Sequence, residues 1–194
     1  MESHQLLNVF LIRNGTPKQL RRGIRNYAMT LLMLDAGLRV GELCKLLQSD
    51  LLFGDTVVQS LVIRAEIAKY KIERTIPLSS RIQMAIAELK NKVWDSSALP
   101  NEAFAFYQKT WHIRLTPRQV QRIIKAAAQQ SIGRAVHPHI LRHTFGTKVW
   151  RKAGERITQE LLGHKSISST QIYMHPDADD LKNAIDDIAE DDIT

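Results

Sequence analysis

The sequence predicts a mainly α-helical protein with one small antiparallel β-sheet or hairpin. Apolar residues recur at intervals of three and four through residues 18–36 and 79–93, which is the period of an amphipathic helix. Residues 56–78 change to a composition rich in β-branched residues, which favours strands. At 194 residues the chain is long enough to bury a hydrophobic core.

The first long helix is expected over residues 18–36. Gly37 is expected to end it, because glycine readily adopts the left-handed conformation that follows a helix. Helix is expected to resume over residues 40–47. The apolar face of the first helix consists of Leu20, Ile24, Tyr27, Ala28, Leu31 and Leu34.

The sheet is expected within residues 56–78, whose sequence is "TVVQSLVIRAEIAKYKIERTIPL". A helix capped by serine follows over residues 79–93. Residues 94–113 show neither period and are expected to be irregular.

The next helix has a clear start. Thr116 is expected to cap it, with Pro117 in the first helical position and Gln119 completing a capping box. Further helices are expected from Pro138 past Trp150, over residues 156–162 and over residues 169–174.

Charge is unevenly distributed along the chain. Residues 177–194 hold eight of the 20 acidic residues and one of the 27 Lys and Arg residues, which leaves a strongly basic body over residues 1–176. Such a body indicates a polyanionic partner, with nucleic acid the first candidate. The acidic end carries three apolar residues at helical spacing, so it is either a frayed end or a helix that docks on a groove, including one on a neighbouring molecule.

The composition predicts a cytoplasmic protein with no membrane contact. No apolar run approaches the roughly 20 residues that cross a membrane, and the first 15 residues lack the order of a secretion signal. The single cysteine, Cys44, cannot form an internal disulfide, which fits a reducing compartment.

Three motifs hold candidate functional residues. They are "GLRVGEL" with Arg39, "HPHILRHTFGT" with His139 and Arg142, and "LLGHKSISSTQIYMH" with His164 and Tyr173. His139 and Arg142 are three residues apart and share one helical face. Taken singly, each motif has a commoner structural explanation: an exposed loop arginine, a solvated pair, or a histidine at a helix end.

Together with a lysine in "AKYKIERTIPL", these motifs resemble the tyrosine recombinases, the phage-integrase family, in their order and spacing. The resemblance covers roughly residues 18–176 and implies the tyrosine-recombinase catalytic-domain fold. It also implies a site-specific DNA recombinase. Such an enzyme transfers a backbone phosphate onto tyrosine, which leaves a 3′-phosphotyrosyl link and a free 5′-hydroxyl.

By this resemblance Tyr173 is the nucleophile. A phenol with a pKa near 10 is ionised in only about one molecule in a thousand at pH 7, so it needs proton removal and a cationic setting. Arg39 and Arg142 grip the non-bridging phosphate oxygens and stabilise charge in the transition state. His139 assists proton transfer, and His164 donates a hydrogen bond to the phosphate.

A lysine protonates the leaving 5′-oxygen in this scheme. The family's Lys-x-x-x-Glu-Arg run matches Lys69 through Arg74. Lys71 is the alternative, since it lies two residues on and is expected on the same strand face. Tyr70 stands where a glycine is common, so the turn geometry stays open. The other histidines near the motifs, His137, His143 and His175, are expected to be structural. For His143 a polar contact with a phosphate oxygen or a carboxylate stays open.

The expected chemistry uses no metal and no cofactor. His139 and His143 have an i, i+4 spacing that suits zinc, but Arg142 between them and the wider pattern argue against it. The sequence has no glycine-rich phosphate loop, so we expect no use of ATP.

The expected organisation is a catalytic domain over residues 1–176 and an acidic amphipathic tail over residues 177–194. We expect the N-terminal, DNA-clamping domain of most family members to be absent. The chain then corresponds either to an excised catalytic domain or to a short member like the fimbrial-switch DNA invertases, which have about this length. DNA binding without the clamp is expected to be weaker.

The expected partner is double-stranded DNA, with Lys71 and Arg118 as candidate contacts. By resemblance, four copies act on two DNA sites, and the tail exchanges between subunits. Two other functions stay open: a DNA-binding regulator without turnover, and a relative of the type IB topoisomerases. The sequence does not give the target site, nor does it distinguish integration from excision, inversion or dimer resolution.

Overall fold

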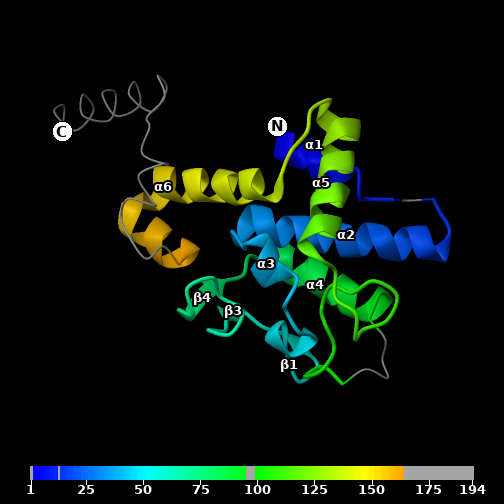
Figure 1. Cartoon of the computed structure of the whole chain (residues 1–194), viewed down its shortest axis with the longest axis horizontal. Coiled ribbons are helices and arrows are strands. Elements are labelled where there is room, and N and C mark those ends of the chain that lie inside the picture. The colour runs from blue at the N-terminus through cyan, green and yellow to red at the C-terminus, as the bar shows by residue number, and fades with distance from the viewer. Residues whose placement is uncertain (1, 13, 95–98, 164–194) are drawn as a thin grey trace.

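The computed structural model describes residues 2–12, 14–94 and 99–163, and it has the predicted fold class (Figure 1). The helices of these residues are α1 (Glu2–Asn8), α2 (Pro17–Asp35), α3 (Val40–Leu43), α4 (Ser80–Lys92), α5 (Pro117–Ile132) and α6 (Pro138–Leu162). The short 3₁₀ helix η1 spans Gln48–Asp50. The strands are β1 (Leu52–Phe53), β2 (Thr56–Val57), β3 (Ser60–Ile63) and β4 (Arg74–Pro77).

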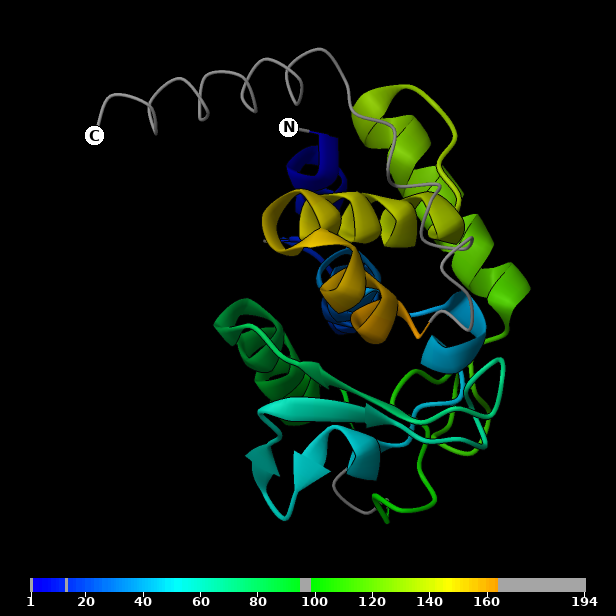
Figure 2. The ribbon, with the colours of Figure 1, turned by 90° about the vertical axis from the view of Figure 1, so that its left-hand side faces the viewer.

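Helix α2 forms the centre of the core. It packs against α1, α4 and α6. Figure 2 shows it end-on, with α1, α5 and α6 on one side and α4 with the strands on the other. Every residue from Ala28 to Leu34 is buried, so the C-terminal half of α2 has no polar face. The single apolar face predicted for this helix was therefore too narrow.

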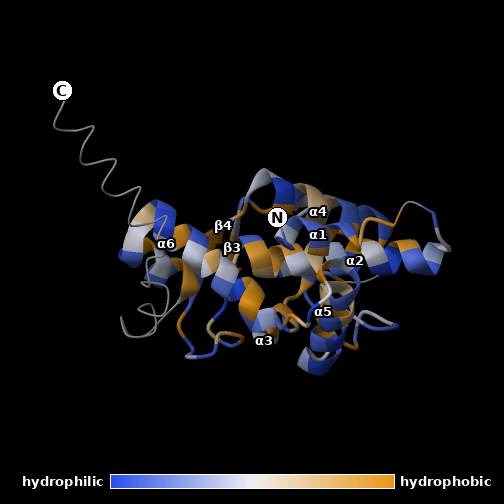
Figure 3. Ribbon diagram, turned by 90° about the horizontal axis from the view of Figure 1, so that it is seen from above, coloured by the Kyte–Doolittle hydropathy of each residue, from blue (hydrophilic) through white to orange (hydrophobic). Residues whose placement is uncertain are grey.

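The predicted caps of α4 and α5 are confirmed, and α2 begins at Pro17, one residue before its predicted start, with a cap that was not predicted. Thr16 Oγ1 accepts a hydrogen bond from the Gln19 N–H at 3.3 Å at the start of α2. Ser79 caps α4, and Thr116 and Gln119 form the predicted capping box of α5. Figure 3 colours most of the visible turns of α5 as hydrophilic, whereas the buried apolar residues of α2 lie in its C-terminal half. In the described part of the chain, no helix combines the length and apolarity needed to cross a bilayer.

The predicted sheet is two separate antiparallel pairs. Strands β3 and β4 pair with Leu61 opposite Ile76 and Ile63 opposite Arg74. All four of these residues are buried, because side chains on one face of a strand alternate with those on the other. The prediction of a single sheet within residues 56–78 required strand β2 to join this pair. Strand β2 pairs with β1 instead.

Helix α6 contains a sharp bend. Gly154 has φ 74° and ψ −177°, which no helical residue adopts. Figure 1 shows the orange end of α6 turning back at this point, beneath the rest of the helix. The two segments correspond to the helix predicted past Trp150 and the short one predicted over residues 156–162. The bend brings the C-terminal end of α6 to β4.

Three other local features differ from the predictions or lie outside the described residues. Helix α1 was not predicted. The helix expected over residues 40–47 ends at Leu43, since Leu47 instead forms a bridge with Phe104. The helix expected over residues 169–174 lies outside the described residues.

Candidate active site

Arg39 lies in the short turn between α2 and α3. Gly37 has φ 62°, which lets the chain leave α2 and reverse within a few residues. Arg39 then occupies the N-cap position of α3. Its backbone N–H donates to Glu42 Oε2 at 2.9 Å, and its Nη1 donates to Glu42 Oε1 at 3.0 Å. The guanidinium is therefore fixed to the helix that follows it, and its side chain is 15% exposed.

Glu42 is shared by two arginines. Arg74 donates from Nη1 to Oε1 at 3.0 Å and from Nη2 to Oε2 at 2.7 Å, in the planar two-bond geometry of an arginine–carboxylate pair. Burial by itself raises the pKa of the Glu42 carboxyl, but the hydrogen bonds and charges of Arg74 and Arg39 outweigh it. The pKa therefore lies below its ordinary value, and the carboxylate stays ionised at neutral pH.

Arg142 holds two distant segments together. It lies on the first part of α6, and its side chain is almost fully buried. Its Nη1 donates to the carbonyl of Gly37, and its Nη2 donates to the carbonyl of Leu162 at 2.6 Å. Arg142 thus connects the turn that positions Arg39 with the C-terminal end of the same helix α6.

The last three carbonyls of the described chain each accept a hydrogen bond from a different arginine. Arg74 Nε donates to Leu161, Arg142 Nη2 to Leu162, and Arg39 Nη2 to Gly163 at 3.4 Å. Carbonyls at a helix C-terminus lack partners within the helix and carry partial negative charge, so cations are favoured there. The helix end thereby gathers three guanidinium groups, from the turn before α3, from β4 and from α6.

Close backbone packing accompanies this arrangement. Gly163 has φ 59°, and a Cβ atom at this position would lie 2.8 Å from Arg74 Cδ. Glycine is therefore required both by the backbone conformation and by the arginine side chain next to it.

His139 lies at the exposed start of α6, one turn before Arg142. His139 and Arg142 lie on one helix, as predicted, although His139 is exposed and Arg142 is buried. His137 occupies the N-cap position of α6 without a side-chain cap hydrogen bond. His143 is exposed on the same helix.

Lys69 and Lys71 lie in the loop between β3 and β4, and neither is part of a strand. The expectation that they share a strand face was wrong, because strand pairing ends at Ile63 and Arg74. The Lys69 Nζ lies 5.2 Å from the centroid of the Tyr70 ring, and the Arg39 Cζ lies 5.8 Å from the same centroid. Lys69 and Arg39 therefore both approach the Tyr70 ring.

Comparison with known proteins identifies the group to which this arrangement belongs. Residues 12–180 match the phage integrase family. The chain belongs to this family.

Its relatives include proteins named tyrosine recombinases. XerC of Bacillus licheniformis is 37% identical over 166 residues, which cover 82% of this chain and 52% of that protein. XerA of Pyrococcus furiosus is 36% identical over 164 residues, which cover 84% of this chain and 54% of that protein. The chain thus spans about half the length of the curated relatives it matches.

Solved structures of the family have the same fold. The crystal structure of XerA recombinase matches with a TM-score of 0.73 and 26% identity, over 94% of this chain and 61% of that one. XerH bound to its difH substrate in a pre-cleavage complex matches with a TM-score of 0.68 and 19% identity, over 94% of this chain and 50% of that one. At that identity the XerH likeness shows the fold alone.

Two residues of the family motifs lie outside the described part of the structure. His164 directly follows the last described residue, and Tyr173 lies nine residues further on. The acidic tail over residues 177–194 also lies outside it. The roles of these residues stay predictions.

Arg39, Arg74 and Arg142, with the carboxylate of Glu42, form a group that we call the arginine cluster. Sequence reasoning missed Glu42 and Arg74 as members of it. Both lie inside the quoted family motifs, "GLRVGEL" and "AKYKIERTIPL". A signal for Arg74 was present, since it lies two residues before Ile76 and so shares the buried face of β4 with it. A charged residue on a buried face needs a charged partner, and Glu42 is that partner.

Arg118 is exposed on the first turn of α5. Arg122 and Lys125 follow at intervals of four and three, and both are exposed. These three residues form one basic stripe along α5. The stripe is on a different helix from the arginine cluster.

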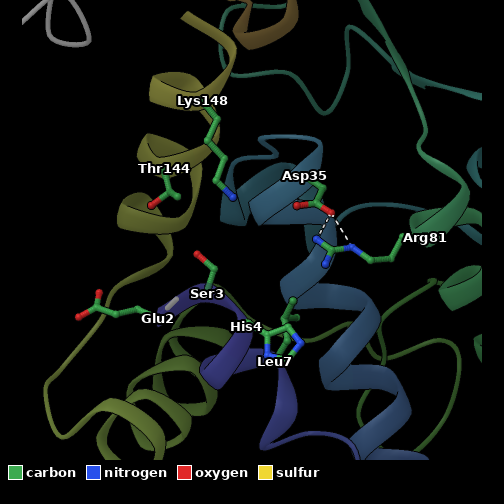
Figure 4. A pocket seen from close by; sticks show the side chains of 8 residues that line it. All are labelled: Glu2, Ser3, His4, Leu7, Asp35, Arg81, Thr144 and Lys148. Carbon is green, nitrogen blue, oxygen red and sulfur yellow. Dashed lines mark hydrogen bonds and ion pairs between the residues drawn. The ribbon is translucent and has the colours of Figure 1, made fainter. Parts of the chain in front are cut away.

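Two surface grooves are present near these elements. One, of about 500 Å³, is lined by residues of α1, α2, α4 and α6. Figure 4 shows the Arg81–Asp35 ion pair on one side of it and Lys148 and Thr144 projecting from α6. None of the described site residues lines it. The second, of about 550 Å³, lies beside Arg74 and Gly163. Within the described residues, no group of three His, Cys, Asp or Glu side chains is placed to hold a metal ion.

Proposed function

We propose that this chain is the catalytic domain of a site-specific DNA recombinase, which cleaves and rejoins strands through a 3′-phosphotyrosyl intermediate. The observation that carries the proposal is the convergence of Arg39 and Arg142. They are far apart in the sequence and lie on different elements, yet they bind the carbonyls of adjacent residues. His164 directly follows those two residues in the sequence.

The proposed step is an in-line transfer of the phosphate. The Tyr173 oxygen attacks the scissile phosphorus and loses its proton, a new P–O bond forms, and the bond to the 5′-oxygen breaks. The leaving oxygen takes a proton and becomes a free hydroxyl. The phosphotyrosyl bond keeps the energy of the original phosphodiester, so a second 5′-hydroxyl can reverse the step on another strand.

Arg39 and Arg142 serve as the phosphate clamp in this proposal. Both keep their positive charge at any physiological pH. Arg142 is almost fully buried, where a charge is screened less than it is in water. Their fixed positions mean that little reorganisation accompanies the growth of negative charge on the phosphate, which is how such groups lower a barrier.

The proton-transfer roles fall to three further residues. Lys69 protonates the leaving 5′-oxygen, and its contact with the Tyr70 ring, which Arg39 also approaches, supports this role. His139 takes part in proton transfer at the nucleophile, from the exposed start of α6. His164 donates a hydrogen bond to the phosphate.

Double-stranded DNA is the proposed substrate. The basic stripe on α5, with Arg118 at its start, and Lys71 in the β3–β4 loop are the proposed contacts. Phosphate contacts fix the register of the protein on DNA, whereas contacts to base edges select the sequence. XerH, which has this fold, was solved bound to its difH substrate.

We also propose a catalytic unit over residues 1–176 and an exchange segment over residues 177–194, with four copies acting on two DNA sites. The apolar stripe of the tail docks on a neighbouring subunit in this arrangement. Deletion of residues 177–194 should then reduce assembly on paired sites more than binding to a single site. Equal losses in the two measurements would contradict the exchange role.

The decisive experiment traps the covalent intermediate. DNA from the flanks of the gene, nicked near inverted repeats, is incubated in EDTA with wild type and with Tyr173→Phe. We expect a protein–DNA adduct on a denaturing gel with wild type only. Binding without an adduct in either protein would point to a regulator, and relaxation of supercoiled DNA without sequence preference would point to a topoisomerase.

A further inference from the structure

The Tyr70 ring is close to both cations that the proposed reaction uses, one on the phosphate and one on the leaving group. Its ring centroid is 5.2 Å from Lys69 Nζ and 5.8 Å from Arg39 Cζ. Both distances are within the roughly 6 Å over which a cation is attracted to an aromatic face. The ring is half exposed, so burial in the core does not account for its position.

The backbone permits a large side chain at this position. Tyr70 itself does not have a positive φ. The left-handed residue of the loop is its neighbour Lys71, with φ 54°. Residue 70 is therefore free to carry a ring without strain.

The loop is anchored directly before Lys69. Ile67 and Ala68 are buried, and the N–H of Lys71 donates to the carbonyl of Ala68 at 3.2 Å. The base of the loop is fixed by Arg64, which donates to Asp50 at 2.7 and 3.0 Å. The backbone of Lys69 therefore has a defined place, and the flexible part is its four-carbon side chain.

We propose that Tyr70 is a positioning residue that holds the Lys69 ammonium beside Arg39, at the leaving oxygen of the scissile phosphate. Two like charges repel, so Lys69 in solution would turn away from Arg39. The negative face of the ring attracts both cations and offsets part of that repulsion. The inference rests on the proposed function and gives a role to a residue that the catalytic scheme leaves without one.

The test compares two leaving groups. One nicked substrate carries the ordinary 5′-bridging oxygen, which must be protonated as the P–O bond breaks. The other carries a 5′-bridging sulfur, which departs as a thiolate and needs no proton. Adduct formation is measured in single-turnover reactions for wild type, Tyr70→Phe, Tyr70→Leu and Lys69→Ala, with Ile72→Ala as a control from the same exposed part of the loop.

With the oxygen substrate we expect Tyr70→Leu to be about fivefold slower than wild type, since the ring contact with Lys69 accounts for roughly a factor of two to five. Tyr70→Phe keeps the ring and should stay within about twofold, as should Ile72→Ala. Lys69→Ala should lose about a hundredfold or more. With the sulfur substrate, Tyr70→Leu and Lys69→Ala should both return to within about twofold of wild type.

Each contrary result has a separate meaning. Tyr70→Leu with wild-type rate on oxygen would overturn the positioning role. So would a loss that persists on sulfur, because the ring would then act on the phosphate clamp or on the fold and not through Lys69. Absence of a wild-type adduct with both substrates would overturn the proposed function itself, and the positioning role with it.

Discussion

Arg74 and Glu42 form a buried ion pair joined by two hydrogen bonds, and the same carboxylate holds Arg39. The Arg74 side chain is 5% exposed and that of Glu42 is 2% exposed. Arg74 also donates to Leu161, at the end of α6. One strand residue therefore fixes the carboxylate that orients Arg39 and the segment that leads to His164.

The first prediction concerns the stability of this pair. Arg74→Met should lower the free energy of unfolding by about 3 kcal/mol, because it leaves a buried carboxylate with one partner fewer. Glu42→Gln should cost a similar amount. The double variant should cost clearly less than the sum of the two, which a double-mutant cycle of urea unfolding curves measures.

A matched control comes from the exposed pair of Lys92 and Glu88 on α4. Lys92→Met should change the unfolding free energy by less than about 1 kcal/mol, as is usual for surface ion pairs. If Arg74→Met proved equally mild, the buried pair would be dispensable for the fold.

The second prediction concerns acid. The pKa of Glu42 is lowered in the folded protein from its ordinary value of 4.5. The stabilisation from its charged form is therefore complete above about pH 4.5 and is lost as the pH falls through the lower, folded pKa. Unfolding free energies of wild type and Glu42→Gln, measured from pH 3 to pH 7, should converge at the acidic end. A constant gap between the two curves would contradict the lowered pKa.

Features of the fold that depend on interactions between near neighbours in the sequence were predictable, and those that depend on distant residues were not. The starts of α4 and α5 were predictable, because caps such as Ser79 and Thr116 act within four residues. The place where the helix after Arg39 ends was not, since Leu47 is drawn away by Phe104, far along the chain. Local patterns carry no information on such pairings.

The candidate site divides in the same way. Arg39, His139 and Arg142 could be named from family motifs, and their elements were largely correct. The link through Glu42 and Arg74 depends on the bend at Gly154, which returns the end of α6 to β4. The sequence predicted a break between two helices near this glycine, but not the direction in which the chain turns, because local patterns do not report a contact as distant as that of α6 with β4. The strand-like pattern also extended too far and placed Lys71 on a strand that it does not join.

The third prediction separates charge from geometry at Arg39. Arg39→Lys keeps the positive charge but loses the planar fork that binds Glu42 and, in the proposed reaction, the phosphate. Single-turnover adduct formation should fall by about a hundredfold, whereas DNA affinity in a gel-shift assay should change only a few-fold. Arg81→Lys, which alters an ion pair in the separate groove of Figure 4, is the matched control and should react normally.

The fourth prediction concerns the basic stripe on α5. Arg118→Gln should weaken DNA binding, and the slope of log affinity against log salt should become shallower by about 0.9 if Arg118 contacts one phosphate. A contact to a base edge would instead relax the sequence preference and leave the slope nearly unchanged. Lys92→Gln removes one charge from α4 and is expected to change neither quantity. Wild-type affinity and specificity in Arg118→Gln would exclude this end of α5 from the interface.

The fifth prediction uses two glycines that end helices. Gly163 and Gly133 both have positive φ, 59° and 72°, so alanine at either position is strained by the backbone. At Gly133 a Cβ atom meets nothing within 4 Å, whereas at Gly163 it would lie 2.8 Å from Arg74 Cδ. Gly133→Ala should therefore cost about 1 kcal/mol of unfolding free energy. Gly163→Ala should cost more, because Arg74 must move.

The catalytic consequence should differ even more than the stability. Moving Arg74 disturbs Glu42 and hence the guanidinium of Arg39, so Gly163→Ala should slow adduct formation at least tenfold at temperatures where it is fully folded. Gly133 ends helix α5, away from the arginine cluster, so Gly133→Ala should react at the wild-type rate. Equal rates for the two variants would mean that Arg74 does not transmit its position to Arg39, because both variants carry the same backbone strain and only one touches the arginine.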